Sequence, residues 1–304
     1  MKLVFLGTPD FAVKPLEKIF ASKHEILAVV TQPDRPVGRK AIITPCAVKA
    51  RACELGLKTL SYEKIRLEGV QDLKALNPDI MVTCAYGQIL SSEILEIAKH
   101  GVINVHASLL PKYRGAAPIQ WSVINGDKVS GVTIMQTGLG VDTGDILLQK
   151  EVEIASEETA GELFDKLSVL GSDLIVEALN LIENGEITPV KQNEEQATHV
   201  KMLKKEDGFI DFSKTATDVK NLVRGLNPWP IAFTKYEDKT LKVYKASVVD
   251  EKGEAGTVIK NSGEIIVACG EQAVSLEEIQ IEGGRRMTAK EFLLGRKIPV
   301  GYRF

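Results

Sequence analysis

The feature that most constrains the fold is an alternation of short β-rich runs with amphipathic stretches through the first 150 residues. The predicted strands are Lys2 to Leu6, Ile26 to Thr31, Asp79 to Ala85 and Val102 to His106. Between them, three stretches have helical character: Phe11 to Ala21, Cys46 to Glu54 and Ser91 to Lys99. This order is typical of βαβ units around a parallel sheet. We therefore predict an α/β fold, with a Rossmann-like parallel-sheet domain at the N-terminus.

Two further strands and a helix are predicted to complete this domain. Gly131 to Gln136 and Ile146 to Ile154 are the strands, and a glycine-rich polar turn joins them. Thr159 to Glu162 then has the T-x-x-E form of a capping box. Leucines follow at helical spacing, at Leu163, Leu167, Leu170 and Leu174. This helix is predicted to pack on the sheet and close the domain.

A polar run from Pro189 to Asp207 predicts an exposed linker. We place the first domain at residues 1–190, the linker at 191–207 and a second domain at 208–304. The second domain has a predicted helix at Ala216 to Leu226, followed by short strands. These strands are Ile231 to Tyr236, Leu241 to Val249, Gly256 to Ile259, Glu264 to Ala268 and Ala273 to Ile281. About a hundred residues of this kind favour a small OB-like β-barrel.

Composition excludes several classes of protein. The content of 44% hydrophobic and 26% charged residues is ordinary for a globular chain. The longest apolar runs fall short of the roughly 18 residues of a membrane span, and Gly7-Thr8-Pro9-Asp10 interrupts the first apolar run before it could act as a signal segment. A cytoplasmic monomer is predicted. The cysteines form no C-x-x-C pair, so no metal is expected.

The first predicted strand-to-helix turn argues against a nicotinamide cofactor. Gly7-Thr8-Pro9-Asp10 has one glycine where the dinucleotide-binding fingerprint needs three. Two interpretations stay open for this turn: an anion site at a helix N-terminus and a plain structural turn.

The strongest functional signal is the pair Asn104 and His106 in the strand Val102 to His106. Alternation puts both side chains on one face, with Cα atoms roughly 6.5 Å apart. Unpaired polar groups inside a sheet cost about 1–3 kcal/mol each. We therefore predict a site at the C-terminal end of this strand, where ligands bind in open α/β sheets. His24, His100 and His199 lack such neighbours and are predicted to be structural or surface residues.

A third polar element is the loop from Gly138 to Asp145, whose three glycines permit a tight path between two strands. One of its carboxylates, Asp142 or Asp145, could reach His106 and orient the imidazole. An Asn, His, Asp trio of this kind suits acyl transfer without a protein nucleophile. The alternative is that both aspartates only stabilise the turn.

Three of these features together resemble the folate-dependent formyltransferases, which move a formyl group from 10-formyltetrahydrofolate to an amine. They are Asn104-x-His106, the Ser-Leu-Leu-Pro run that begins at Ser108, and Asp142. Other motifs narrow the resemblance to the members that act on methionyl-tRNA. These are Gly7 to Phe11, Thr31 to Pro36, Arg114 to Ile119 and Leu226 to Pro230. The resemblance extends from Met1 to about Gly301.

The resemblance implies a role for each matching residue. Asn104 is expected to donate a hydrogen bond to the developing formyl oxyanion. His106 is expected to relieve the attacking amine of a proton or to protonate the departing N10, and Asp142 to orient the imidazole. The folate-binding segment corresponds to Ser108, Leu109, Leu110 and Pro111. The implied cofactor is 10-formyltetrahydrofolate as formyl donor, with no metal.

The resemblance also implies initiator methionyl-tRNA as partner. The loop Pro33 to Pro45 resembles the family's tRNA-acceptor loop, and Arg39 matches an arginine that engages the acceptor end. Members often carry several lysines there, whereas this chain has an apolar run, Ala41-Ile42-Ile43. Residues 204–304 hold 17 basic and 15 acidic side chains, too small an excess to predict nucleic-acid binding alone. Candidate phosphate contacts are Lys201, Lys204, Lys205, Arg285, Arg286, Arg296 and Lys297.

Two other functions stay open. The first keeps the catalytic half and changes the acceptor to a sugar-nucleotide amine or glycinamide ribonucleotide. The second domain argues against glycinamide ribonucleotide, whose formylation needs no added barrel, but it does not exclude the sugar. The second function is a tRNA-binding module whose catalytic half is inert, which the intact trio disfavours.

Overall fold

The chain forms two compact units, each built from separate stretches of sequence. The computed structural model describes residues 1–38 and 40–304. The first unit comprises Met1–Gly115, Ser130–Val152 and Phe164–His199. The second comprises Ala116–Val129, Glu153–Leu163 and Val200–Phe304. The domain limits at 190 and 208 stay a prediction, because compact units of this kind need not coincide with domains.

The first unit is built on a seven-stranded sheet of order β10-β9-β7-β6-β1-β2-β5. The strands are β1 (Lys2–Gly7), β2 (Glu25–Thr31), β5 (Thr59–Ser61), β6 (Ile80–Cys84), β7 (Val102–His106), β9 (Val129–Gln136) and β10 (Ile146–Glu153). From β5 to β7 all pairings are parallel, which confirms the predicted parallel sheet. β9, however, runs antiparallel to β7, a direction that the residue pattern did not predict.

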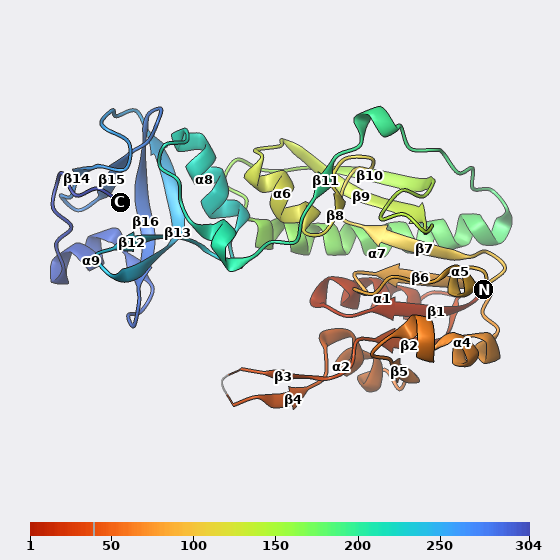
Figure 1. Ribbon diagram of the computed structural model, residues 1–304. Helices are drawn as coiled ribbons and strands as arrows, with labels where there is room; N and C mark the ends of the chain where they lie inside the picture. Colours follow the sequence, from red (N-terminus) through yellow and green to blue (C-terminus); the bar gives the residue numbers. More distant parts are fainter. Residues whose placement is uncertain (39) are drawn as a thin grey trace. The chain divides into compact units, whose positions relative to one another are not determined.

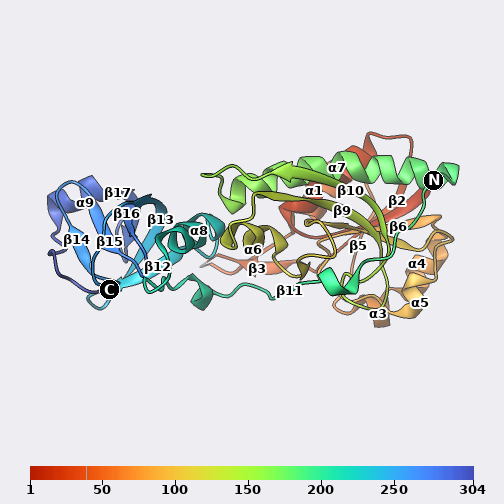
Figure 2. The same ribbon diagram turned by 90° about the horizontal axis from the view of Figure 1, so that it is seen from above.

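One face of this sheet is covered by α1 (Val13–Phe20) and the long helix α7 (Ala160–Asn184), as Figure 2 shows. The rings of Phe11 and Phe164 meet edge to face at 5.3 Å, and the Ser168 hydroxyl donates to the Phe11 carbonyl at 2.9 Å. Thr159 and Glu162 form reciprocal bonds across the N-terminus of α7. The predicted capping box and helix are therefore confirmed.

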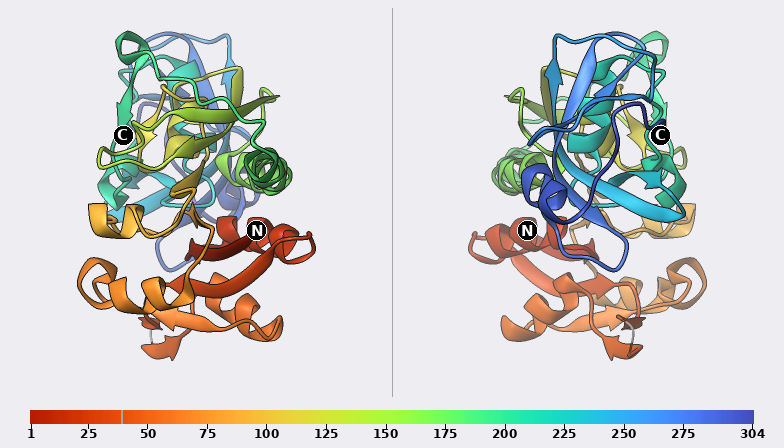
Figure 3. Two further views of the ribbon diagram at one scale, coloured as in Figure 1. Left: turned by 90° about the vertical axis from the view of Figure 1, so that its right-hand side faces the viewer. Right: turned by 90° about the vertical axis from the view of Figure 1, so that its left-hand side faces the viewer.

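The other face is covered by three short helices, α3 (Ile65–Glu68), α4 (Val70–Leu76) and α5 (Ser92–Leu95). In Figure 3 the orange segments with α3 and α4 and the green α7 lie on opposite sides of the sheet. Apolar strand residues pack with residues of these helices, among them Val4, Leu6, Met81, Leu73 and Ile94. α5 is shorter than the predicted Ser91 to Lys99. α2 (Ala47–Glu54) matches its prediction.

Where the sequence predicted a loop from Pro33 to Pro45, the structure has a β-hairpin (Figure 1). Its strands are β3 (Arg35–Val37) and β4 (Ile42–Thr44), and they pair antiparallel. Ile42 and Ile43 are 62% and 63% exposed. The sequence has no pattern of alternating apolar residues that would predict this hairpin, because β4 is exposed along its length.

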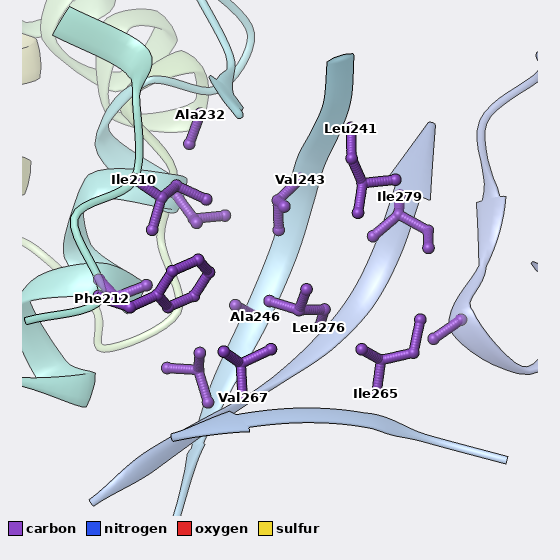
Figure 4. Close-up of a cluster of buried hydrophobic side chains, with 14 of the residues drawn as sticks. Ile210, Phe212, Ala232, Leu241, Val243, Ala246, Ile265, Val267, Leu276 and Ile279 are labelled. Atoms are coloured by element: carbon purple, nitrogen blue, oxygen red, sulfur yellow. The ribbon is translucent and has the colours of Figure 1, made fainter. Parts of the chain in front are cut away.

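The second unit contains an antiparallel sheet of order β12-β13-β16-β15-β14, with β17 beside β16. Its strands are β12 (Ala232–Tyr236), β13 (Lys239–Val249), β14 (Val258–Lys260), β15 (Ile265–Ala268), β16 (Ala273–Ile281) and β17 (Met287–Thr288). Its helices are α6 (Pro118–Ile124), α8 (Ala216–Gly225) and α9 (Ala289–Gly295). Figure 4 shows the core, where Leu241, Val243 and Leu276 face Ile210 and Phe212. The curled antiparallel sheet confirms the predicted small barrel-like fold.

The stretch predicted as a linker has structure of its own. It contains two 3-10 turns, η2 (Glu194–Gln196) and η3 (Lys205–Gly208), and the strand β11 (His199–Val200). β11 pairs with β8 (Arg114–Gly115). The segment after Val190 therefore lies against the chain that follows β7.

A buried arginine joins the separate stretches of the second unit. Arg224 of α8 is 8% exposed. Its guanidinium donates to the Asn221 side chain at 2.8 Å, the Glu158 carbonyl at 3.0 Å, and the Ala155 and Val123 carbonyls at 3.4 Å each. Burial lowers its pKa from the ordinary value. One side chain thus connects α8 with α6 and with the stretch around residue 155.

We expect Arg224→Met to lower the free energy of unfolding of the second unit by about 2–4 kcal/mol, because the buried carbonyls of Val123 and Glu158 lose their donor. Both tryptophans of the chain, Trp121 and Trp229, lie in this unit, so tryptophan fluorescence during urea unfolding measures it. Lys220→Met is the matched control, since it removes the surface ion pair with Glu157, which is worth at most about 1 kcal/mol. Equal midpoints for the two variants would contradict the assignment.

Candidate functional site

Asn104 and His106 lie on the same face of β7, as their spacing predicts. Val105 between them points to the opposite face and packs against Gly171 of α7. His106 is 6% exposed, whereas Asn104 is half-buried. The strand therefore presents one open amide and one enclosed imidazole at its C-terminal end.

The Asn104 amide is fixed by one hydrogen bond. The Thr83 hydroxyl of β6 donates to Oδ1 of Asn104 at 2.9 Å, and β6 and β7 are paired so that these two residues face each other. Within residues 1–38 and 40–304, the Nδ2 group of Asn104 has no hydrogen-bond partner. The amide therefore has its acceptor occupied and its two donors available.

The His106 imidazole is hydrogen-bonded at one nitrogen and faces a carboxylate with the other. Nε2 lies 3.0 Å from the Tyr113 carbonyl oxygen. Because a carbonyl oxygen only accepts, Nε2 is the donor in this bond. Nδ1 lies 3.6 Å from Oδ2 of Asp142, which is too long for a hydrogen bond and within ion-pair distance only for a protonated imidazole. The ring orientation therefore depends on the loop after β7 and on the loop that carries Asp142.

Of the two aspartates in the glycine-rich loop, Asp142 is the one whose carboxylate faces His106. Oδ2 of Asp142 also accepts a hydrogen bond from the Gly115 amide at 2.8 Å. Asp142 has φ +54°, in the left-handed region, a conformation uncommon for residues other than glycine. The position of this carboxylate thus depends on an unusual backbone turn.

Two residues near the site were not predicted from the sequence as site residues. Arg114 is 1% exposed, and it forms a bidentate ion pair with Glu194 at 2.7 and 2.8 Å. These bonds raise the pKa of Arg114 and lower that of Glu194. Arg114 also donates to the Gln192 side chain, which donates to the carbonyls of Asp142 and Gly144. Sequence reasoning placed Gln192 in an exposed linker.

The predicted folate-binding segment, Ser108 to Pro111, is largely occupied by internal bonds. The Ser108 hydroxyl donates to the Lys112 carbonyl at 2.7 Å, and the Leu110 amide donates to the Thr133 hydroxyl at 3.1 Å. Ser108 and Leu110 are buried, whereas Leu109 and Pro111 are partly exposed. The peptide bond between Leu110 and Pro111 is cis. The segment thus supports the turn that carries Tyr113, and its role in folate binding stays a prediction.

The predicted nucleic-acid contacts are mostly exposed side chains. Arg39 lies outside the described residues. Lys204 and Lys205 are exposed and form no ion pair in the part of the chain that the structure describes. Arg286 pairs with Glu278 and lies 4.4 Å from the Tyr244 ring centroid, and Arg285 lies 3.9 Å from Glu291. Lys201 pairs with Asp207 at 2.8 Å. Arg296 and Lys297 are exposed.

Within residues 1–38 and 40–304, no helix is both long and apolar enough to cross a membrane. No cluster of three or more His, Cys, Asp or Glu side chains in those residues could hold a metal ion.

Comparison with known proteins identifies both halves of the chain. Residues 1–179 match the family described as "Formyl transferase", and residues 202–297 match "Formyl transferase, C-terminal domain". A curated relative from Caldanaerobacter subterraneus subsp. tengcongensis is 46% identical over 99% of both chains. One from Acetivibrio thermocellus is 47% identical over 99% of this chain and 98% of its own. Both are named methionyl-tRNA formyltransferase.

Solved structures with the same fold are more distant. An N-formyltransferase from Helicobacter canadensis, solved with folinic acid and dTDP-3-aminofucose, superposes with TM-score 0.70 at 21% identity, over 91% of this chain and 99% of its own. HypX from Aquifex aeolicus with tetrahydrofolic acid has TM-score 0.66 at 15% identity, over 100% of this chain and 51% of its own. At such identities these likenesses show the fold alone. The two family matches and the full-length relatives show that this chain belongs to the formyl transferase family, among its methionyl-tRNA formyltransferases.

Proposed function

We propose that this protein transfers the formyl group of 10-formyltetrahydrofolate to the α-amine of initiator methionyl-tRNA, for translation initiation. The observation that carries the chemistry is the Asn104 amide, whose donors are available beside an imidazole held by Tyr113 and Asp142. Two full-length relatives, 46% and 47% identical to this chain, support methionyl-tRNA as the acceptor, because both are named methionyl-tRNA formyltransferase.

Asn104 stabilises the charge that develops on the formyl oxygen. The Thr83 hydroxyl occupies Oδ1 of Asn104, so the amide presents its NH2 group to a ligand. A donor fixed before the reaction needs little reorganisation as negative charge appears, and one such donor is commonly worth about 2.7–4 kcal/mol. The rigid pairing of β6 with β7 supplies this preorganisation.

His106 moves the protons of the reaction. It takes a proton from the attacking amine or gives one to the departing nitrogen, a function that suits an imidazole near neutral pH. Asp142 faces Nδ1 and Tyr113 holds Nε2, so the ring cannot turn freely. Nδ1, which makes no hydrogen bond in the described residues, is the nitrogen left to exchange this proton with the substrates.

The residues around this edge of the sheet fit a flat, partly apolar ligand such as the folate. When bound, 10-formyltetrahydrofolate supplies a formyl carbon open to attack by an amine. Ile89, on the segment after β6, is 72% exposed, and Leu139 and Val141, on the loop with Asp142, are 75% and 60% exposed. Ile89 precedes Asn104 in the chain, and Leu139 and Val141 precede Asp142 in its loop. We assign these three apolar side chains, together with Leu109 and Pro111, to contacts with the folate.

Methionyl-tRNA binds through exposed cations and the hairpin of β3 and β4. Lys204 and Lys205 are the best placed of the predicted contacts, because they need not break an ion pair to meet a phosphate. Arg285 and Arg286 would have to exchange glutamate partners for phosphates. Arg39 keeps its proposed role at the acceptor end. We also propose that the protein is a monomer and acts in the cytoplasm, where charged tRNA is found.

Acceptor selectivity tests this function against its alternatives. Purified protein is given 10-formyltetrahydrofolate with methionyl-tRNA, uncharged tRNA, glycinamide ribonucleotide or an amino-sugar nucleotide. We expect formyl transfer to methionyl-tRNA only, since the full-length relatives carry that name. Transfer only to a small amine would reject the tRNA assignments and keep the trio. Binding of tRNA without binding of the folate would identify an inert module.

A further inference from the structure

The position of Asp142 is set by a backbone turn that has few stabilising contacts within its own loop. Asp142 has φ +54°, and the same loop then passes Gly144, where an added Cβ would collide with the Gln136 carbonyl oxygen of β9. Leu139, Val141 and Thr143 in this loop are exposed. The loop therefore has few buried side chains of its own to fix the carboxylate that faces His106.

One side chain from outside the loop holds its backbone. Nε2 of Gln192 donates to the Asp142 carbonyl at 2.8 Å and to the Gly144 carbonyl at 2.7 Å. Both bonds are short and span the residue between, so they pin the peptide units on either side of the turn. Gln192 is separated from Asp142 by 50 residues of sequence.

Arg114 fixes which way the Gln192 amide points. Nε and Nη2 of Arg114 donate to Oε1 of Gln192 at 3.0 and 2.8 Å. A guanidinium offers only donors, so Oε1 must face Arg114 and the NH2 group must face the loop. The ion pair between Arg114 and Glu194 in turn holds the guanidinium in a buried setting.

We propose that Gln192 is a positioning residue of the formyl-transfer site, which holds Asp142 in place against His106 through the backbone of the loop. This inference rests on the proposed function, since the residue that it positions is one of the proposed trio. Glutamine is the residue that the geometry requires, because it accepts from a cation on one side and donates to carbonyls on the other.

Gln192→Glu isolates the contact with the loop. A carboxylate still accepts from Arg114, but it offers no donor to the Asp142 and Gly144 carbonyls. We expect kcat to fall about 10- to 100-fold, as for a catalytic group displaced by about 1 Å, while KM for both substrates changes by less than about threefold. Gln196→Glu is the matched control, because Gln196 lies in the same segment, is exposed and makes no side-chain hydrogen bond in the described residues.

A double-mutant cycle separates positioning from a general loss of structure. In the Asp142→Ala background, Gln192→Glu is expected to cost less than about twofold more, because the group that it positions is gone. The proposal would be overturned if the fold-decrease in kcat caused by Gln192→Glu were the same with and without Asp142→Ala. It would also be overturned if the kcat of Gln192→Glu alone stayed within about twofold of that of the parent protein. If Gln192→Glu fails to fold, Gln192→Met removes both donors without adding a charge.

A measurement without substrate keeps this inference distinct from the proposed function. The chain has four histidines, and the His106 ring signal in an NMR spectrum is assigned by its loss in His106→Gln. Gln192→Glu is expected to shift that signal and leave those of His24 and His100 in place. An unmoved His106 signal would overturn the inference whatever the acceptor. If Gln192→Glu shifts the signal but the parent protein does not formylate methionyl-tRNA, the proposed function is rejected and this inference stands.

Discussion

Asn104→Ala should reduce kcat for formyl transfer to methionyl-tRNA by about 100- to 1,000-fold, because it removes the donor that faces the developing oxyanion. KM for 10-formyltetrahydrofolate should change little, since the charge on the oxygen is small before attack. Single-turnover formylation with saturating folate measures the chemical step directly. The half-buried position of Asn104 also predicts that the variant folds.

Thr83→Val is the matched control for this prediction. It keeps the Asn104 side chain and removes the hydroxyl that holds Oδ1 at 2.9 Å, so the amide can turn its acceptor toward the ligand. An intermediate loss, smaller than that of Asn104→Ala, is expected. Full activity in Asn104→Ala would exclude the amide as the source of oxyanion stabilisation.

His106→Ala is expected to lower kcat by about 100- to 10,000-fold, the range for loss of a general acid or base. His106 is 6% exposed, so the substitution leaves a small cavity beside Tyr113 and Asp142. Imidazole added to the buffer should restore part of the rate to this variant by entering that cavity. Initial rates with and without imidazole measure the rescue.

His100→Ala serves as control, because His100 lies before β7 and its side chain makes no hydrogen bond in the described residues. Its rate should stay near that of the parent protein and should not respond to imidazole. A His106→Ala variant with parental activity would reject proton transfer by this residue. Equal rescue of both variants would show that free imidazole acts on the substrates directly.

The sequence predicted the part of the fold that rests on buried, regular elements. β7 was predicted with its observed bounds, Val102 to His106, because its residues are apolar apart from the functional pair. The hairpin of β3 and β4 was predicted as a loop, since strands of three residues are too short to show a periodic pattern. The antiparallel direction of β9 follows from tertiary pairing with β7, and no local pattern encodes it.

The same distinction applies to the candidate site. Asn104 and His106 share one strand, so their proximity could be read from spacing. The selection of Asp142 over Asp145 came from family resemblance, since loop glycines leave the backbone path open. Arg114 and Gln192 are 78 residues apart, and Gln192 stands in a polar run that is indistinguishable from solvent-exposed linker. Only the folded chain brings this polar pair together behind the turn at Asp142.

The interrupted second unit has a consequence for the chain as it is synthesised. Arg224 donates hydrogen bonds to the stretch 116–129 and to the carbonyls near residue 155. This arginine leaves the ribosome roughly 100 residues after α6. At about 5–20 residues per second, α6 waits on the order of 5–20 s for this partner. During that interval Trp121 and Ile124, which pack against the core that includes α8 in the finished protein, remain uncovered. The nascent chain therefore presents this helix to chaperones before the unit can close.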